Sequence, residues 1–366
     1  MKLSIENPRK YDICFKSSFN DLPAYIKETA GEGKKAFIIT DSNVAALYFQ
    51  SFLKLIKPCF KKTSYYILRA GEESKNLKNT ETVLKALLDQ GFTRDDLIIA
   101  FGGGVSGDLA GFCAGIYMRG IDYIQVPTTL LSMVDSSIGG KTAVDMESYK
   151  NMIGVFHSPI LVYENTACLK TLPREQFLSG MGEVIKSALI GDKDLWNFLL
   201  ENKIGYKDLS ETKTEDIAHI LYRSCLVKKK AVDEDPFDTG NRAVLNFGHT
   251  VGHAIEKCSD FRLPHGYCVT LGTICALYIS MSRGCISEAE YKAACEYIKD
   301  IGLYTTVPEE LSLTKKMIME AISKDKKNTS SGLKFILLEE IGKAAVKKDV
   351  TREEIGSSLN VIGIRK

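Results

Sequence analysis

The sequence predicts an α/β protein with an N-terminal Rossmann-like domain, built on a mostly parallel sheet, and a C-terminal, mainly helical metal-binding domain. In the first half, short apolar runs rich in β-forming residues alternate with helical patterns, which is typical of a parallel sheet covered by helices. After about residue 174, long amphipathic stretches replace the strand-like runs. A length of 366 residues favours two domains, each large enough for a core of its own.

The first domain is expected over residues 1–173, and its strands follow from the apolar runs. Between the second run and the third, apolar residues from Leu77 to Leu88 form a helical pattern. The predicted strands are 35–40, 64–68, 97–101, 121–126 and 160–163.

The second domain is expected over residues 174–366. The boundary is placed near Leu172-Pro173-Arg174, because proline ends an element of secondary structure. A run at 334–338 suggests a small hairpin near the end of the chain. The predicted helices include 194–200, 217–230 and 271–281.

Composition narrows the class of protein. A hydrophobic fraction of 45% and a charged fraction of 26% are ordinary for a globular enzyme. The net charge of only +2 gives no basic field for nucleic acid, and no apolar run approaches the roughly 20 residues that span a bilayer. Ten cysteines without a CxxC pair indicate free thiols in a reducing compartment. We therefore expect a cytoplasmic protein that binds neither nucleic acid nor membrane.

A glycine-rich loop, Gly102–Asp108, follows the predicted strand 97–101 and opens a helical run. Glycines let the backbone approach a phosphate, and a helix N-terminus supplies amide donors. The loop satisfies GxGxxG, but a tight structural turn explains that pattern about as often. It also follows the third strand, whereas the standard dinucleotide fingerprint follows the first.

Polar clusters at the ends of other predicted strands support a nucleotide site. Taken singly, each cluster is more often a helix cap or a turn. Taken together they favour a nucleotide, because ligands of parallel sheets gather at the carboxyl ends of the strands. The clusters are Asp41 and Asn43, Glu72 and Lys75, and Thr128 and Thr129.

A histidine motif in the second domain indicates a metal. Three of the five histidines lie between 249 and 265, and His249 and His253 share one face of a helix. A single HxxxH pair more often belongs to a polar network of the core. Here His265 adds a third imidazole and Glu183 is the best candidate for a carboxylate, which together suit a catalytic zinc.

Cations and amides recur beside these motifs. Surface exposure is the default expectation for lysine. So many of them near one metal would suit a small, strongly anionic substrate, since lysine and arginine bind phosphate and carboxylate groups. The residues are Arg119, Lys141, Lys150, Asn151, Lys186, Lys228 and Arg242.

The motifs, in their order along nearly the whole chain, resemble those of the 3-dehydroquinate synthase family of sugar-phosphate cyclases. The resemblance implies an N-terminal NAD-binding domain, a C-terminal metal domain, an active site between them, and a homodimer. The segments that carry it are Thr40–Asn43, Gly71–Lys75, Gly102–Asp108, Tyr117–Gly120, Val126–Leu131, Asp135–Lys141, Lys150–Gly154, Cys168–Thr171, Gly182–Lys186, Arg242–His253 and His265–Gly266.

The resemblance also implies roles for individual residues. Glu183, His249 and His265 would bind Zn²⁺ or Co²⁺, and His253 would lie near the substrate as a proton relay, although spacing alone would have placed His253 on the metal. The residues implied for NAD are Asp41, Asn43, Gly71, Glu72, Ser74, Lys75, Gly103, Gly104, Val105, Ser106, Gly107, Asp108, Thr128, Thr129, Lys141, Lys150, Cys168, Leu169, Lys170 and Thr171. Those implied for substrate and catalysis are Arg119, Asp135, Lys141, Asn151, Lys186, Lys228, Arg242, Asn246, His253 and one lysine of Lys326-Lys327, of which Lys326 is chosen.

Two departures from the family pattern fall beside the implied metal ligands. Gly182 stands where the family usually has alanine. Tyr267-Cys268 replaces Glu-Ala after His265-Gly266, and so removes a carboxylate expected to orient a metal ligand. We therefore expect these departures to affect the metal affinity of the site or the orientation of a histidine ligand.

The implied reaction converts 3-deoxy-D-arabino-heptulosonate 7-phosphate (DAHP) into 3-dehydroquinate and phosphate, through a hydride lent to NAD⁺ and returned. Three alternatives stay open. A metal-dependent alcohol or glycerol dehydrogenase would have little need of Lys141, Lys186, Arg242 and Asn246 together. A sister cyclase acts on a substrate without a carboxylate. An inactive NAD- or sugar-phosphate-binding protein would not need an intact set of metal ligands.

Overall fold

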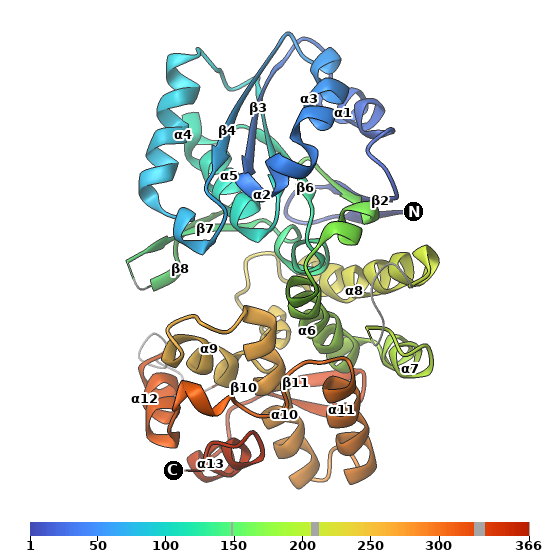
Figure 1. The fold of residues 1–366 in the computed structure, drawn as a ribbon, viewed down its shortest axis with the longest axis vertical. Coiled ribbons are helices and arrows are strands. Elements are labelled where there is room, and N and C mark those ends of the chain that lie inside the picture. Colours follow the sequence, from blue (N-terminus) through green and yellow to red (C-terminus); the bar gives the residue numbers. More distant parts are fainter. Residues whose placement is uncertain (148, 206–211, 326–333, 366) are drawn as a thin grey trace. The chain divides into compact units, whose positions relative to one another are not determined.

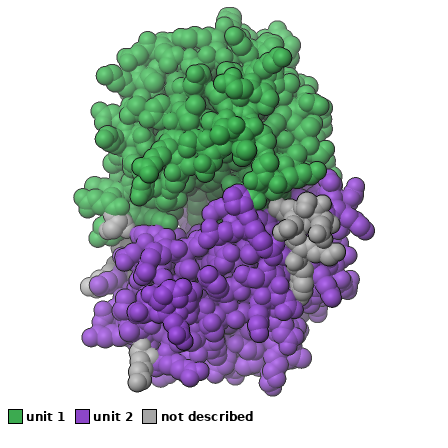
Figure 2. Space-filling view, in the orientation of Figure 1, with its two compact units in different colours: residues 1–172 green, residues 173–366 purple. Residues whose placement is uncertain are grey.

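The computed structural model describes residues 1–147, 149–205, 212–325 and 334–365. The chain divides into two compact units, Met1–Leu172 and Pro173–Lys366, shown in different colours in Figure 2. That the first unit holds a nucleotide and the second a metal stays a prediction. Among the residues described, no helix is long and apolar enough to cross a membrane.

The first unit is built on a seven-stranded sheet in the order β1-β2-β9-β6-β5-β3-β4. Every neighbouring pair is parallel except β1 and β2, which confirms the mostly parallel sheet. The strands are β1 (Lys2–Ile5), β2 (Tyr11–Lys16), β3 (Lys35–Asp41), β4 (Lys62–Leu68), β5 (Leu97–Gly102), β6 (Asp122–Pro127) and β9 (Leu161–Asn165). All five predicted strands are present, and β1 and β2 were not predicted.

Both faces of this sheet are buried. Along β3, Ile38 belongs to one apolar cluster while Phe37 and Ile39 belong to the other, because successive side chains of a strand point to opposite faces. Helices α1 (Leu22–Ala30) and α3 (Gln50–Ile56) cover one face, and α4 (Leu77–Asp89) and α5 (Gly104–Ile116) cover the other (Figure 1).

The helical pattern predicted from Leu77 to Leu88 is confirmed as α4. Its buried residues are Thr80, Val83 and Leu87, whereas Leu77 and Leu88 are exposed. The segment Asp135–Lys141 spans two elements, because Asp135 lies in a helical turn and Lys141 begins a hairpin of β7 (Lys141–Met146) and β8 (Tyr149–Phe156). Gly139 and Gly140, both at positive φ, make the turn between them.

The second unit is mainly helical, as predicted, and ends in a hairpin of β10 (Phe335–Glu340) and β11 (Lys343–Lys347) followed by a helix. Helix α10 is buried along nearly its whole length and packs against α6 and α9. The helices are α6 (Arg174–Gly191), α7 (Lys193–Glu201), α8 (Thr214–Glu234), α9 (His249–Cys258), α10 (His265–Ser282), α11 (Glu288–Asp300), α12 (Lys315–Asp325) and α13 (Arg352–Val361).

Candidate active site

Three helices of the second unit bring a carboxylate and three imidazoles together. Glu183 lies in the middle of α6, His249 and His253 lie one turn apart on α9, and His265 begins α10. Oε1 of Glu183 is 3.7 Å from Nε2 of His249 and 3.5 Å from Nε2 of His265. The three imidazoles also offer nitrogens within 4.8 Å of one another. Proximity alone therefore admits His253 as well as Glu183 among the ligands.

The orientation of two of the rings is consistent with a ligand set of Glu183, His249 and His265. Nδ1 of His249 lies 3.1 Å from the carbonyl oxygen of Phe247, and Nδ1 of His265 lies 3.3 Å from Oε2 of Glu256. With Nδ1 engaged in this way, each ring directs Nε2 toward Glu183 and leaves it available to a metal. One carboxylate and two imidazoles form a common ligand set of catalytic zinc.

The Glu183 carboxylate itself fits such a role. Both oxygens are shielded from solvent and neither accepts a hydrogen bond of normal geometry, although the ammonium of Lys186 contacts Oε2. A buried carboxylate is costly unless cations compensate it, and while Lys186 contacts Oε2, Oε1 faces the two imidazoles. The residues present thus suit a divalent cation.

Charges around the cluster prepare the ligands. Burial alone would raise the pKa of Glu183, but the charge of Lys186 and the imidazoles of His265 and His249 together lower it well below its usual range. Burial and the charge of Lys186 lower the pKa of His249, which keeps that imidazole neutral as a metal ligand must be. Burial would also lower the pKa of His265, but Glu183 and Glu256 outweigh it and raise the pKa to about 10. A metal at Nε2 would displace that proton.

Glu256 is a residue of this site that the sequence analysis missed. It lies on α9, seven positions after His249 and three after His253, so the helical period puts it on their face. That spacing was visible in the sequence. The pairing with His265, on another helix, was not.

The predicted substrate cations of this unit are buried rather than on the surface. Lys186, Lys228 and Arg242 have exposed fractions of 2%, 7% and 3%. Helix α6 packs against both α8, which carries Lys228, and the turn 241–246, which carries Arg242 and Asn246. Asn246 is exposed. Together the two lysines and the arginine concentrate positive charge where solvent is excluded, which makes these side chains candidates for holding an anion.

One aspartate organises the turn that carries Arg242. The Asp235 carboxylate accepts hydrogen bonds from the backbone N–H groups of Thr239 (2.9 Å), Gly240 (2.7 Å) and Arg242 (3.2 Å). These hydrogen bonds lower the pKa of Asp235 to about 2. The guanidinium of Arg242 donates to the carbonyl oxygen of Pro236 at 2.7 Å, which holds the side chain in place.

In the first unit, the glycine loop lies at a switch point of the sheet. Strands β3 and β5 are neighbours, but β3 connects to β4 on one side and β5 connects to β6 on the other. Ligands of open α/β sheets bind where the carboxyl ends of two such strands diverge. Asp41 ends β3 and Gly102 ends β5, so the predicted nucleotide residues meet there.

The local geometry of the loop suits a phosphate. No side chain caps the N-terminus of α5 at Gly103, which leaves its first amides directed outward. A Cβ at Gly102 would lie 2.7 Å from Oγ of Ser106 and 3.0 Å from Oδ2 of Asp41, so only glycine fits. Asp41 also caps a short helix by accepting from Asn43 and Val44, so the helix-cap interpretation holds beside the functional one.

A buried cation links further predicted residues of this unit. The Lys75 ammonium lies 2.6 Å from Oδ2 of Asp108 and 3.8 Å from Oε1 of Glu72, and it donates to Oδ1 of Asn151 on β8. Burial would lower the pKa of Lys75, but the charges of Asp108 and Glu72 outweigh burial and raise it. Lys75 is therefore a fixed positive charge.

The remaining predicted residues of this unit are spread over several turns. Thr171 pairs with the hydroxyl of Tyr48, and burial raises the pKa of the Cys168 thiol to about 12, so that cysteine is no nucleophile. Thr128 donates its N–H to the carbonyl oxygen of Gly102. Those with exposed side chains are Arg119, Lys141, Lys170 and Thr171. Lys326 and Lys327 lie outside the described residues.

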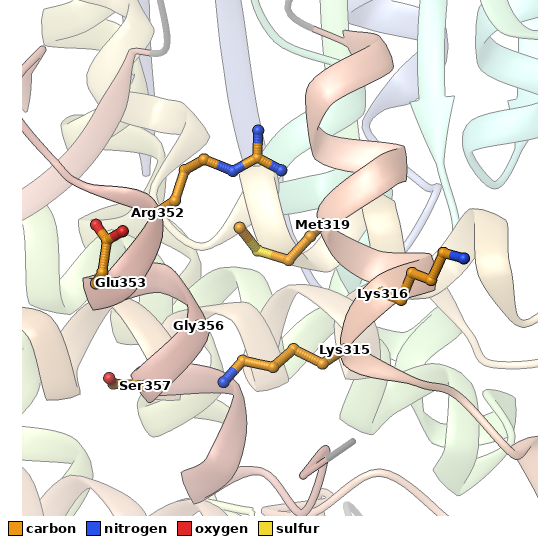
Figure 3. A pocket seen from close by; sticks show the side chains of 7 residues that line it. All are labelled: Lys315, Lys316, Met319, Arg352, Glu353, Gly356 and Ser357. Carbon is orange, nitrogen blue, oxygen red and sulfur yellow. The ribbon is translucent and has the colours of Figure 1, made fainter.

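A groove of about 570 Å³ in the second unit contains none of the predicted site residues. Lys315 and Met319 extend from α12 toward α13, whereas Lys316 points away (Figure 3). Arg352, Glu353, Gly356 and Ser357 on α13 complete the lining. Its side chains are mostly exposed, so we do not assign a function to it.

Comparisons with known proteins match both halves of the chain. Family models described as "3-dehydroquinate synthase N-terminal" and "3-dehydroquinate synthase C-terminal" match residues 65–179 and 180–328. A 3-dehydroquinate synthase from Thermoanaerobacter pseudethanolicus is 42% identical over 349 residues, covering 95% of this chain and 96% of that protein.

Solved structures agree in fold. A 2-epi-5-epi-valiolone synthase from Streptomyces hygroscopicus, with NAD⁺ and Zn²⁺ bound, gives a TM-score of 0.89 at 24% identity and covers 100% of this chain and 99% of its own. A 2-deoxy-scyllo-inosose synthase, complexed with carbaglucose-6-phosphate, NAD⁺ and Co²⁺, gives 0.87 at 25% identity and covers 98% and 99%.

Proposed function

Because the chain belongs to the 3-dehydroquinate synthase family, we propose that it converts DAHP into 3-dehydroquinate and inorganic phosphate. The observation that carries the proposal is the cluster of Glu183, His249 and His265, with the buried Lys186 in contact with Glu183. The chain that holds this cluster matches the family from residue 65 to residue 328.

Two cofactors are part of the proposal. NAD⁺ would bind at the β3/β5 switch point of the first unit, and Zn²⁺ or Co²⁺ would bind to Glu183, His249 and His265. The two cyclases described above carry NAD⁺ with one of these metals. When bound, the metal would polarise a substrate hydroxyl and the nicotinamide would hold a hydride.

The substrate chemistry requires no net oxidation. Removal of a hydride from C5 and of the proton from its hydroxyl gives a ketone, which acidifies the neighbouring C6–H. Loss of the C6 proton and cleavage of the C7–O bond then release phosphate, and return of the hydride to C5 with a proton to its oxygen restores the hydroxyl. Ring opening and an intramolecular aldol step close the carbocycle. The enzyme would therefore be a carbon–oxygen lyase that acts on phosphate.

The side chains of the protein would bind and orient this anionic substrate. The residues proposed to hold its carboxylate and phosphate are Arg119, Asn151, Lys186, Lys228, Arg242, Asn246 and Lys326. Asp135, Lys141 and Lys150 are proposed to border both the cofactor and the substrate. Holding one substrate in the correct orientation through several steps is itself a large part of catalysis. His253 is exposed at the metal cluster and is proposed to relay protons near the substrate.

Phosphate release from DAHP tests the proposal directly. The purified protein should release phosphate only when both NAD⁺ and a divalent metal are present, and prior treatment with a chelator should stop the reaction. A sister cyclase would turn over a substrate that lacks the carboxylate and leave DAHP unchanged.

The protein is also proposed to be a cytoplasmic homodimer. Light scattering of the purified protein in solution measures its mass and so tests whether it is a dimer.

A further inference from the structure

The two imidazoles of the proposed metal set are oriented by different kinds of partner. Nδ1 of His249 faces a backbone carbonyl, that of Phe247. Nδ1 of His265 faces a side chain, the Glu256 carboxylate, at 3.3 Å. Only the orientation of His265 therefore depends on a residue that a substitution can remove.

Glu256 is unusual as a carboxylate. Only 5% of it is exposed, although it is an acidic residue on a helix. Burying a carboxylate is costly unless it is paired, and His265 is the partner that its geometry shows. The position two residues after His265 holds Tyr267, whose buried ring packs edge-on against Tyr304 at 5.2 Å between ring centroids. Because position 267 carries a tyrosine, the carboxylate that contacts His265 is that of Glu256 on α9.

We propose that Glu256 is a positioning residue for the metal site. It accepts a hydrogen bond from Nδ1–H of His265, which fixes the tautomer and points Nε2 at the position shared with Glu183 and His249. Its charge also makes the imidazole a stronger ligand. This inference rests on the proposed metal set, and adds to it a residue that does not touch the metal.

Metal affinity of the purified protein, measured by competition with a chromophoric zinc chelator, tests the inference. Glu256→Ala should weaken zinc binding about 10- to 100-fold, as is usual when an orienting partner of a ligand is lost. Glu256→Gln keeps a hydrogen-bond acceptor but loses the charge, so it should weaken binding by a smaller factor. The Co²⁺ absorption spectrum should change in Glu256→Ala, because a loosened imidazole alters the coordination geometry.

Asp260→Asn is the matched control, since Asp260 is an exposed carboxylate just beyond the same helix with no contact to His265 among the described residues. It should leave both readouts unchanged. Circular dichroism and thermal unfolding of the metal-free proteins identify variants that fail to fold, and Glu256→Gln, which is nearly isosteric, then carries the test.

The outcomes separate this inference from the proposed function. If wild type binds no zinc, or Glu183→Gln binds as tightly as wild type, the proposed metal set is wrong. If Glu183→Gln loses zinc while Glu256→Ala and Glu256→Gln keep the wild-type affinity and Co²⁺ spectrum, Glu256 only packs the core and the inference is wrong.

Discussion

At the scale of single residues, buried charge marks the candidate site of the second unit. Glu183, Lys186, Lys228 and Arg242 are all at least nine-tenths buried. A helical unit stabilised only by apolar packing would leave such side chains at the surface. Their burial therefore indicates a polar site, and the lysines and arginine indicate that its ligand is anionic.

Replacement of Arg242 by alanine should weaken catalysis more than folding. If Arg242 holds a charged group of the substrate, kcat/KM for DAHP should fall by an amount equivalent to about 2–4 kcal/mol. Steady-state phosphate release measures this. Arg352→Ala, which removes an exposed arginine of the groove in Figure 3, should keep wild-type kinetics. Equal kcat/KM in wild type and Arg242→Ala would contradict the assignment.

The turn that positions Arg242 should weaken in acid. The pKa of Asp235 is lowered to about 2 from an ordinary value of 3.8, so its contribution to stability is complete above about pH 5 and is lost as the pH falls toward 2. Asp235→Asn should therefore reduce the free energy of unfolding by about 1–2 kcal/mol at pH 7, and by progressively less below pH 4.

Urea unfolding at several pH values measures the effect of Asp235. Glu234→Gln neutralises the adjacent, exposed carboxylate and should change stability little at any pH. A difference between wild type and Asp235→Asn that stays constant from pH 7 to pH 3 would mean that the ionised carboxylate does not stabilise this turn.

At the scale of elements, close approach of helices places the metal ligands. Helix α6 carries Glu183 and α10 begins at His265, and the two meet at Gly182 and Gly266. A Cβ at Gly182 would lie 2.5 Å from the carbonyl oxygen of Gly266 and 2.8 Å from Oγ1 of Thr270. The glycine that departs from the family pattern is therefore required by this particular packing.

Gly182→Ala should destabilise the protein, because backbone and not a flexible side chain opposes the added methyl group. Overpacking of this kind costs about 1–3 kcal/mol, which urea unfolding would detect. Gly356→Ala is the control. A Cβ at this helical glycine would lie 2.9 Å from Cε of Lys315, which is the flexible end of a side chain and can move away. Alanine should therefore leave stability unchanged or raise it. If both variants are equally stable, α6 and α10 accommodate a methyl group at position 182, and the expected clash with Gly266 is wrong.

At the scale of the whole molecule, the fold alone does not decide between a dehydrogenase and a cyclase. One architecture hosts many reactions, so a shared fold does not determine the chemistry. The family match and the buried cations of the second unit favour the cyclase. The two reactions differ in NAD⁺ stoichiometry, because in a cyclase NAD⁺ takes a hydride from the substrate and returns it within the same turnover.

NAD⁺ use should therefore be catalytic. With DAHP in large excess over NAD⁺, phosphate should be released over many turnovers. The NADH concentration, followed by its absorbance, should stay no higher than about the enzyme concentration. Parallel assays of phosphate and NADH measure the ratio. One NADH per phosphate would identify a dehydrogenase-type reaction, and phosphate release wholly indifferent to removal of NAD⁺ would exclude both.

The sequence by itself determined the features that depend on local spacing. The runs that form β3, β4, β5, β6 and β9 are short, apolar and separated by helical patterns, so their period identifies them. The glycines at the start of α5 and the histidines of α9 are likewise recognisable within a few residues. The short strands β1 and β2 escaped prediction, because β2 is defined by its parallel pairing with β9, far along the chain.

Only the tertiary structure decided which of these groups meet. The direction of Nε2 in His249 and His265, the approach of Glu183 from α6, and the contact of Glu256 with His265 join separate helices. The contact of Lys75 with Asn151 of the β7–β8 hairpin is equally nonlocal. Spacing in sequence fixes which residues share a face of one element, whereas contacts between elements depend on packing that no single segment encodes.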